Sequence, residues 1–224
     1  MLVSVVIRTK NEAHWVGRCL FAVANQSLAD FEIILVDNES TDRTLEIARS
    51  FDVKVVSVPT QDFSHGRALN LGIGAASGRY VAILSGHCIP RDNYWLAKLL
   101  ANFQDPAVAG VYGRQEPLPD TNDFDKRDLW TTFGIERRAQ HKDYFFHNAN
   151  SMIRRTVWEK HPFDEALKGL EDRMWAKEVL AEGYVIVYEP SASAYHYHGI
   201  HQGRDEKRAE RVVKVIEMKL NASH

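Results

Sequence analysis

Short apolar runs alternate with amphipathic segments along the first hundred residues, and this alternation constrains the fold more than any other feature. The runs are rich in Val, Ile and Leu, end in polar or turn residues, and occupy residues 2–7, 32–36, 53–58 and 80–84. Helical apolar spacing occupies residues 13–26, 42–50 and 67–76. Mostly apolar strands are typical of sheets covered on both faces. The pattern therefore predicts βαβ units in an α/β fold, with a mostly parallel central sheet and helices on both faces.

Polar residues follow three of these predicted strands, at 8–12, 37–40 and 85–87. In a parallel sheet the carboxyl ends of neighbouring strands lie at one edge, where open α/β sheets bind their ligands. We therefore expect these three segments to converge on one site.

The second half is less regular. We expect helices over residues 93–103, 121–141 and 170–182 and strands over 108–112, 145–153 and 185–188. The charged segment 203–224 has amphipathic spacing, which favours a C-terminal helix that docks on the body of the protein or on a second copy in a homodimer. We expect a single domain over residues 1–224, in which residues 1–115 bind the ligand and residues 116–202 complete the site.

Composition argues against several classes of protein. Lys and Arg number 28 against 30 Asp and Glu, a formal net charge of -2, so no nucleic-acid partner is expected. Two cysteines, Cys19 and Cys88, argue against a disulfide framework. The chain shows neither the residue order of a secretory signal nor an apolar window of 18 residues. We expect a cytoplasmic protein that could work at the inner face of a membrane.

Several polar residues have both a structural and a functional interpretation. Asp37 is either a turn aspartate or an acceptor for a ligand N–H group. Arg67 lies at a helix start, where backbone N–H groups and a cation can bind a diphosphate, although a solvated arginine is the alternative. His87 is a metal ligand, an imidazolium facing an anion, or a hydrogen-bonded strand end. His196 and His198 alternate, which puts both imidazoles on one side of an extended segment and favours the metal interpretation.

Five segments, taken in order, resemble the family 2 glycosyltransferases with a GT-A fold. They are SVVIRTKNE, IILVDNESTDRT, HGRALNLGI, GRYVAILSGHCIP and LEDRMWAKEVLAEGYVIVYEP, and the resemblance covers roughly residues 3–200. It implies an inverting enzyme that moves a hexose or deoxyhexose from a UDP or dTDP sugar to a saccharide or lipid-linked acceptor in surface-polysaccharide synthesis. The segments DFSHG and YGRQEPLPD look most like the rhamnosyltransferase-like branch of that family.

The resemblance also implies roles for individual residues. Asp37 would accept the imide N–H of uracil or thymine, and Asp172 would be the catalytic base, with Glu171 orienting it or contacting the acceptor. The acceptor cleft would include Arg114, Gln115 and Trp130. The residues implied for nucleotide-sugar binding are Thr9, Asn11, Glu12, Asp37, Arg67, Ser85 and His87.

One departure from the family concerns the cation. Ser85-Gly86-His87 stands where most members carry an Asp-x-Asp that holds a divalent cation against the diphosphate. A cofactor ion, Mn²⁺ or Mg²⁺, would then be held by His87, His196 and His198. Imidazole suits Mn²⁺ and later transition metals better than Mg²⁺.

Two alternative functions are a sugar nucleotidyltransferase and a non-catalytic binding protein. A sugar nucleotidyltransferase would need a glycine-rich basic loop after the first strand, whereas residues 8–12 contain no glycine. A non-catalytic sugar-nucleotide or glycan-binding homologue would explain the lost metal aspartates, but the retained Glu171-Asp172 pair argues against it.

Overall fold

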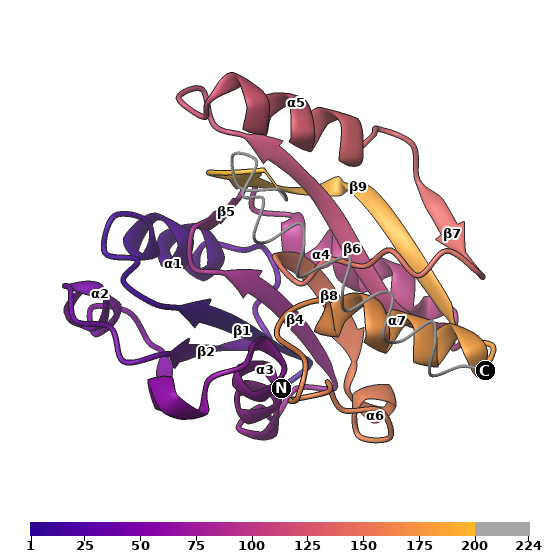
Figure 1. Ribbon diagram of the computed structural model, residues 1–224, viewed down its shortest axis with the longest axis horizontal. Coiled ribbons are helices and arrows are strands. Elements are labelled where there is room, and N and C mark those ends of the chain that lie inside the picture. Colours follow the sequence, from indigo (N-terminus) through magenta and orange to yellow (C-terminus); the bar gives the residue numbers. More distant parts are fainter. Residues whose placement is uncertain (200–224) are drawn as a thin grey trace.

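The computed structural model describes residues 1–199, which form one mixed sheet with helices on both faces (Figure 1). The strand order is β3-β2-β1-β4-β8-β6-β9-β5, and β7 pairs with β9. The strands of this described part are β1 (Val3–Thr9), β2 (Phe31–Asp37), β3 (Lys54–Ser57), β4 (Tyr80–Ser85), β5 (Cys88–Pro90), β6 (Val108–Pro117), β7 (Arg138–Gln140), β8 (Asn150–Arg154) and β9 (Val185–His196).

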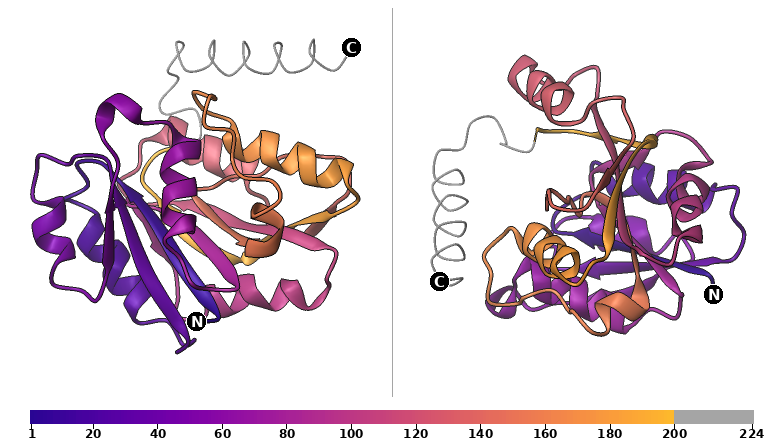
Figure 2. Two further views of the ribbon diagram at one scale, coloured as in Figure 1. Left: turned by 90° about the horizontal axis from the view of Figure 1, so that it is seen from below. Right: turned by 90° about the vertical axis from the view of Figure 1, so that its right-hand side faces the viewer.

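The helices separate into two layers, which Figure 2 shows from two further directions. The α-helices are α1 (Val16–Ala24), α2 (Thr44–Ala48), α3 (His65–Gly74), α4 (Trp95–Ala101), α5 (Asp123–Thr132), α6 (Arg155–Trp158) and α7 (Glu171–Ala181), with 3₁₀ turns at Thr60–Asp62 and Asn102–Gln104. Buried residues of α1, α2 and α4 share one core, and those of α3, α5, α6 and α7 share the other.

The two cores follow from the alternation of side chains along each strand. In β1, Val5 and Ile7 join the core under α1 and α4, whereas Val6 joins the core under α3 and α7. The strands therefore have to be apolar on both faces, as their sequences are.

The first half of the sheet confirms the expected βαβ arrangement. β1 pairs in parallel with β2 and with β4, and β2 pairs in parallel with β3. In this register Thr9 lies opposite Asp37, and Arg8 lies opposite Ser85. The carboxyl ends of three strands thus meet at one edge.

The second half differs from the sequence prediction in several places. β8 runs antiparallel between β4 and β6, while β6 and β9 run parallel. The helix expected over 121–141 is wrong beyond Thr132, because residues 138–140 pair with β9 as an edge strand. The strand expected over 145–153 begins only at Asn150, and the strand expected over 185–188 continues to His196.

Three further expectations concern the cysteines, membrane-spanning segments and the C-terminal segment. Cys19 and Cys88 are free thiols in the core, so no disulfide joins them. In the part of the chain that the structure describes, no helix is both long and apolar enough to cross a bilayer. The C-terminal helix expected over 203–224 lies outside the described residues.

Candidate functional site

The carboxyl end of β1 is the centre of the candidate site. Residues 8–12 leave the sheet there and contact the ends of β2 and β4 and the starts of α3 and α7. Gly86 allows the turn after β4 to approach this point, since a Cβ at Gly86 would lie 2.6 Å from Thr9 Cγ2. Its N–H donates to the Arg8 carbonyl oxygen at 2.9 Å.

Asp37, the last residue of β2, is only 1% exposed. Its Oδ1 accepts from Thr9 Oγ1 at 3.2 Å and from Ser40 Oγ at 2.5 Å, and its Oδ2 accepts from Ser40 N at 2.9 Å. Within residues 1–199 no Lys or Arg forms an ion pair with this carboxylate. The carboxylate is therefore held by neutral donors in a turn, and it can also accept an N–H from a ligand.

Asn11 ties the loop after β1 to the loop after β2. Its backbone lies in the left-handed region, with φ of 56°, which asparagine tolerates better than most residues. Asn11 N donates to Ser40 Oγ at 2.9 Å, and Asn11 Oδ1 accepts from Thr41 N at 2.8 Å. These bonds hold the two loops together beside Asp37.

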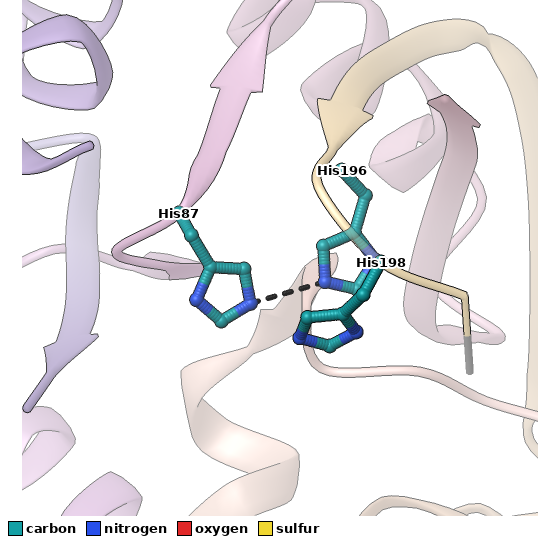
Figure 3. A group of neighbouring side chains, drawn as sticks. All are labelled: His87, His196 and His198. Atoms are coloured by element: carbon teal, nitrogen blue, oxygen red, sulfur yellow. Dashed lines mark hydrogen bonds between the residues drawn. The ribbon is translucent and has the colours of Figure 1, made fainter. Parts of the chain in front are cut away.

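His87, His196 and His198 form the most distinctive cluster of the site (Figure 3). In the β5–β9 register Cys88 lies opposite His196, which brings His87 next to that imidazole. His87 Nε2 lies 3.1 Å from His196 Nε2, and His87 Nδ1 lies 2.6 Å from Glu12 Oε1. One nitrogen from each of the three rings can be chosen so that all lie within 4.8 Å of one another. The donor set therefore fits a metal ion.

Glu171 and Asp172 begin α7, directly after Leu170, whose φ of 63° turns the chain into the helix. Both residues are buried. Burial, and then the charge of Asp172, raises the pKa of Glu171 from 4.5 to about 7, against the opposing charge of Arg8. Arg8 Nη1 lies 3.8 Å from Glu171 Oε1. Close to neutral pH this carboxyl can therefore both hold and release a proton.

Asp172 is oriented by backbone groups. Its Oδ2 accepts from Asn148 N at 3.2 Å, and its Oδ1 accepts from Arg173 N at 2.8 Å. The segment before β8, which carries Asn148, thereby fixes the direction of this carboxylate.

The other predicted site residues are distributed more widely. Ser85 ends β4 at the same edge as Arg8. Arg67 lies in the first turn of α3, as expected, but it is 43% exposed and its Nη1 pairs with Glu165 Oε2 at 3.2 Å. Arg8, which was not among the predicted site residues, contacts Glu171.

The predicted acceptor residues differ in exposure and in their partners. Gln115 is fully buried and its Nε2 donates to His147 Nδ1 at 3.0 Å, while the carbonyl oxygen of Arg114 accepts from Asn150 Nδ2 at 3.0 Å. Trp130 is 57% exposed on α5. Gln115 and Arg114 thus lie inside the sheet region, and Trp130 lies on the outer helix.

Sequence reasoning missed Arg8, His65 and Asn148. Arg8 Nη1 lies 2.8 Å from His65 Nδ1, so it joins the first residue of α3 to the first residue of α7. A signal for Arg8 was present, because it immediately precedes predicted site residues. No local sequence pattern predicts that Arg8 contacts His65 and Glu171.

Comparison with known proteins identifies relatives of this arrangement. The sequence profile described as Glycosyl transferase family 2 matches residues 4–161. The O-antigen chain rhamnosyltransferase RfbN of Salmonella typhimurium is 26% identical over 210 residues, which cover 88% of this chain and 67% of RfbN. The glycosyltransferase AglE of Haloferax volcanii is 30% identical, covering 87% of this chain and 66% of AglE. The chain thus spans about two thirds of these relatives.

Two solved structures share the fold. The mannosyltransferase PcManGT of Pyrobaculum calidifontis, in complex with GDP-Man and Mn²⁺, has a TM-score of 0.69 and 21% identity, covering 87% of this chain and 56% of that one. GalNAc-T7 with UDP, GalNAc and Mn²⁺ has a TM-score of 0.70 and 18% identity, and the match covers 89% of this chain and 44% of that one. These likenesses confirm the GT-A fold. The matched profile over residues 4–161, which is more than half of the chain, shows that this chain belongs to glycosyl transferase family 2.

Proposed function

We propose that the protein is an inverting glycosyltransferase that moves a hexose or deoxyhexose from a UDP or dTDP sugar to a saccharide or lipid-linked acceptor during surface-polysaccharide synthesis. The observation that carries the proposal is a set of three contacts at the carboxyl end of β1. Thr9 contacts the buried Asp37, Glu12 contacts His87 of the histidine cluster, and Arg8 contacts Glu171 of the Glu171-Asp172 pair.

The nucleotide is proposed to bind over residues 1–115, with Thr9, Asn11, Glu12 and Ser85 around it. Asp37 supports a uridine or thymidine donor, because its buried carboxylate, which forms no ion pair with a Lys or Arg of residues 1–199, can accept the imide N–H of either base. The diphosphate is proposed to lie between the amino end of α3, with Arg67 in its first turn, and His87.

The acceptor is proposed to bind over residues 116–202 beside β6, the strand that carries Arg114 and the buried Gln115, and Trp130 offers an exposed ring on which a sugar can stack. RfbN and WbaN, both O-antigen chain rhamnosyltransferases, support a 6-deoxyhexose as the transferred sugar.

Asp172 is proposed as the general base. As the acceptor oxygen bonds to the anomeric carbon, its proton passes to the carboxylate and the bond from that carbon to the diphosphate oxygen breaks. Attack from the face opposite the leaving diphosphate inverts the anomeric carbon. The backbone N–H groups of Asn148 and Arg173 support this role because they hold the carboxylate in one direction, and Glu171 lies beside it on α7.

The three histidines fit a divalent cation, since nitrogens from His87, His196 and His198 can lie within 4.8 Å of one another. A cation bound there would supply positive charge against the diphosphate. The Mn²⁺ present in the PcManGT and GalNAc-T7 structures supports this assignment.

A two-step experiment tests the proposed function. Thermal denaturation of the purified chain with UDP-, dTDP- and GDP-sugars should show stabilisation by the uridine or thymidine donors, because a ligand that binds only the folded state raises its apparent stability. The best donor is then assayed for hydrolysis and transfer.

Asp172→Asn should retain donor binding and lose about 100-fold or more of turnover, which is the contribution expected of a general base. Glu178→Gln, an exposed substitution on the same helix, is the matched control and should behave like the wild type. Absence of stabilisation by any nucleotide sugar would refute the proposed function. Full turnover by Asp172→Asn would refute the assignment of the base.

A further inference from the structure

We propose that His87, His196 and His198 form a metal centre that selects Zn²⁺ or Co²⁺ over Mn²⁺ and Mg²⁺, with Glu12 as the outer partner that orients it. The proposal rests on the proposed function only in placing this centre beside the donor diphosphate. Its selectivity follows from the chemistry of the ligand atoms.

The first step concerns the proton on His87. Its Nδ1 lies 2.6 Å from Glu12 Oε1, and a carboxylate oxygen accepts hydrogen bonds. Nδ1 therefore carries the hydrogen, which leaves the lone pair of the neutral ring on Nε2, the nitrogen that faces His196. Carboxylate partners of this kind commonly orient histidine ligands of metals.

His198 is arranged in the same way. Its Nδ1 lies 2.9 Å from the Gly199 carbonyl oxygen, which can only accept. The hydrogen is again on Nδ1, and the lone pair is on Nε2. Two of the three rings thus have their tautomer set by acceptors outside the cluster.

His196 closes the cluster. It is buried, and its ring stacks on that of His87 with centroids 5.0 Å apart and an interplanar angle of 5°. The two Nε2 atoms are 3.1 Å apart. Zinc–nitrogen bonds of about 2.0–2.1 Å in a tetrahedron separate the ligand atoms by about 3.3 Å. A cation can therefore bind between these two nitrogens with little movement of either ring (Figure 3).

The ligand set decides which cation is preferred. Ser85 stands in place of a carboxylate at the end of β4, and Glu12 is engaged by His87, so the cluster offers imidazole nitrogens. Mg²⁺ prefers six oxygen ligands, and Mn²⁺ is the weakest binder among the first-row divalent ions. Zn²⁺ and Co²⁺ bind imidazole well, and three protein ligands leave a position for a diphosphate oxygen.

The test uses the whole chain after chelator treatment. Titration calorimetry with Zn²⁺, Co²⁺, Mn²⁺ and Mg²⁺ in separate experiments should show Zn²⁺ and Co²⁺ binding at least about 100-fold more tightly than Mg²⁺. The visible absorption of bound Co²⁺ should report nitrogen ligation in a site of low coordination number. Both readouts are independent of sugar transfer.

Variants locate the ion. His198→Ala and His196→Ala should each weaken Zn²⁺ binding by about 100-fold or more, and Glu12→Gln should weaken it by about 10- to 100-fold, the range for outer partners of metal ligands. His198 is partly exposed, so its variant remains informative if that of the buried His196 fails to fold. His161→Ala removes another histidine–carboxylate pair, with Glu182 at 3.0 Å, and should leave Zn²⁺ affinity unchanged.

His87→Asp restores a carboxylate and should shift the preference toward Mg²⁺. Equal affinity for Zn²⁺ and Mg²⁺ in the wild type, or unchanged Zn²⁺ affinity in His198→Ala, would overturn the proposal. Donor binding separates it from the proposed function. If the protein binds Zn²⁺ but no nucleotide sugar, only the proposed glycosyltransferase function is refuted. If the protein binds a nucleotide sugar but prefers Mg²⁺ to Zn²⁺, only the proposed metal selectivity is refuted.

Discussion

Replacing Glu171 with glutamine should change how the stability of the protein depends on pH. The Glu171 residue is only 5% exposed and lies beside Asp172 at the start of α7. Burial, and then the charge of Asp172, raises its pKa from 4.5 to about 7, although Arg8 at 3.8 Å opposes the change. Glutamine keeps the size of the side chain and cannot titrate.

The sign follows from linkage between protonation and folding. An acid with a higher pKa in the folded state holds its proton more tightly when folded, so its protonated form contributes stability that is fully present below about pH 4.5 and is lost as pH rises through about 7. Each pH unit between these values removes about 1.4 kcal/mol, which amounts to about 3 kcal/mol over the whole window.

Urea denaturation of both proteins between pH 4 and pH 8 measures this effect. The free energy of unfolding of Glu171→Gln minus that of the wild type should increase by about 3 kcal/mol across the window, because contributions from other groups largely cancel in the difference. Glu178→Gln, exposed on the same helix, should give a difference that does not vary with pH. A constant difference for Glu171→Gln would show that burial does not raise the pKa of this carboxyl.

Four further substitutions test the fold and the nucleotide site. Gly113→Ala would push a Cβ into the backbone of β9 and should cost several kcal/mol in thermal denaturation, whereas Gly74→Ala, with no atom within 4 Å of the added Cβ, should change stability by less than about 1 kcal/mol. Trp95→Phe removes the 2.8 Å hydrogen bond from Nε1 to Asn150 Oδ1 in the core, and the unpaired acceptor should cost about 1–3 kcal/mol in urea denaturation. Asp37→Asn should weaken UDP binding at least about tenfold in calorimetry, which is about 1.4 kcal/mol, and unchanged affinity would argue against its role in base recognition.

Prediction from the sequence was most successful where the pattern that predicts a strand also predicts how that strand pairs. The apolar runs that predicted the first four strands also require helices on both faces, and parallel pairing brings the ends of β1, β2 and β4 together. The contact of Thr9 with Asp37, and that of Glu12 with His87, therefore follow from strand order and polarity.

Prediction was less successful beyond residue 115 because pairing there depends on distant chain segments. Residues 138–140 carry no strong strand signal, and they become a strand only because β9 offers a free edge. The helix expected over 121–141 ends at Thr132. An edge of this kind does not exist until the central sheet has formed.

The sequence by itself determined the α/β class, the site edge and the residues available for chemistry, because periodicity and strand ends are local properties of the chain. Only the tertiary structure decided which of those residues meet. It joined Arg8 to His65 across 57 residues and His87 to His196 across 109, and it paired the partly exposed Arg67 with Glu165. Such contacts depend on the order of the strands and on the elements that flank them, which no local spacing of residues records.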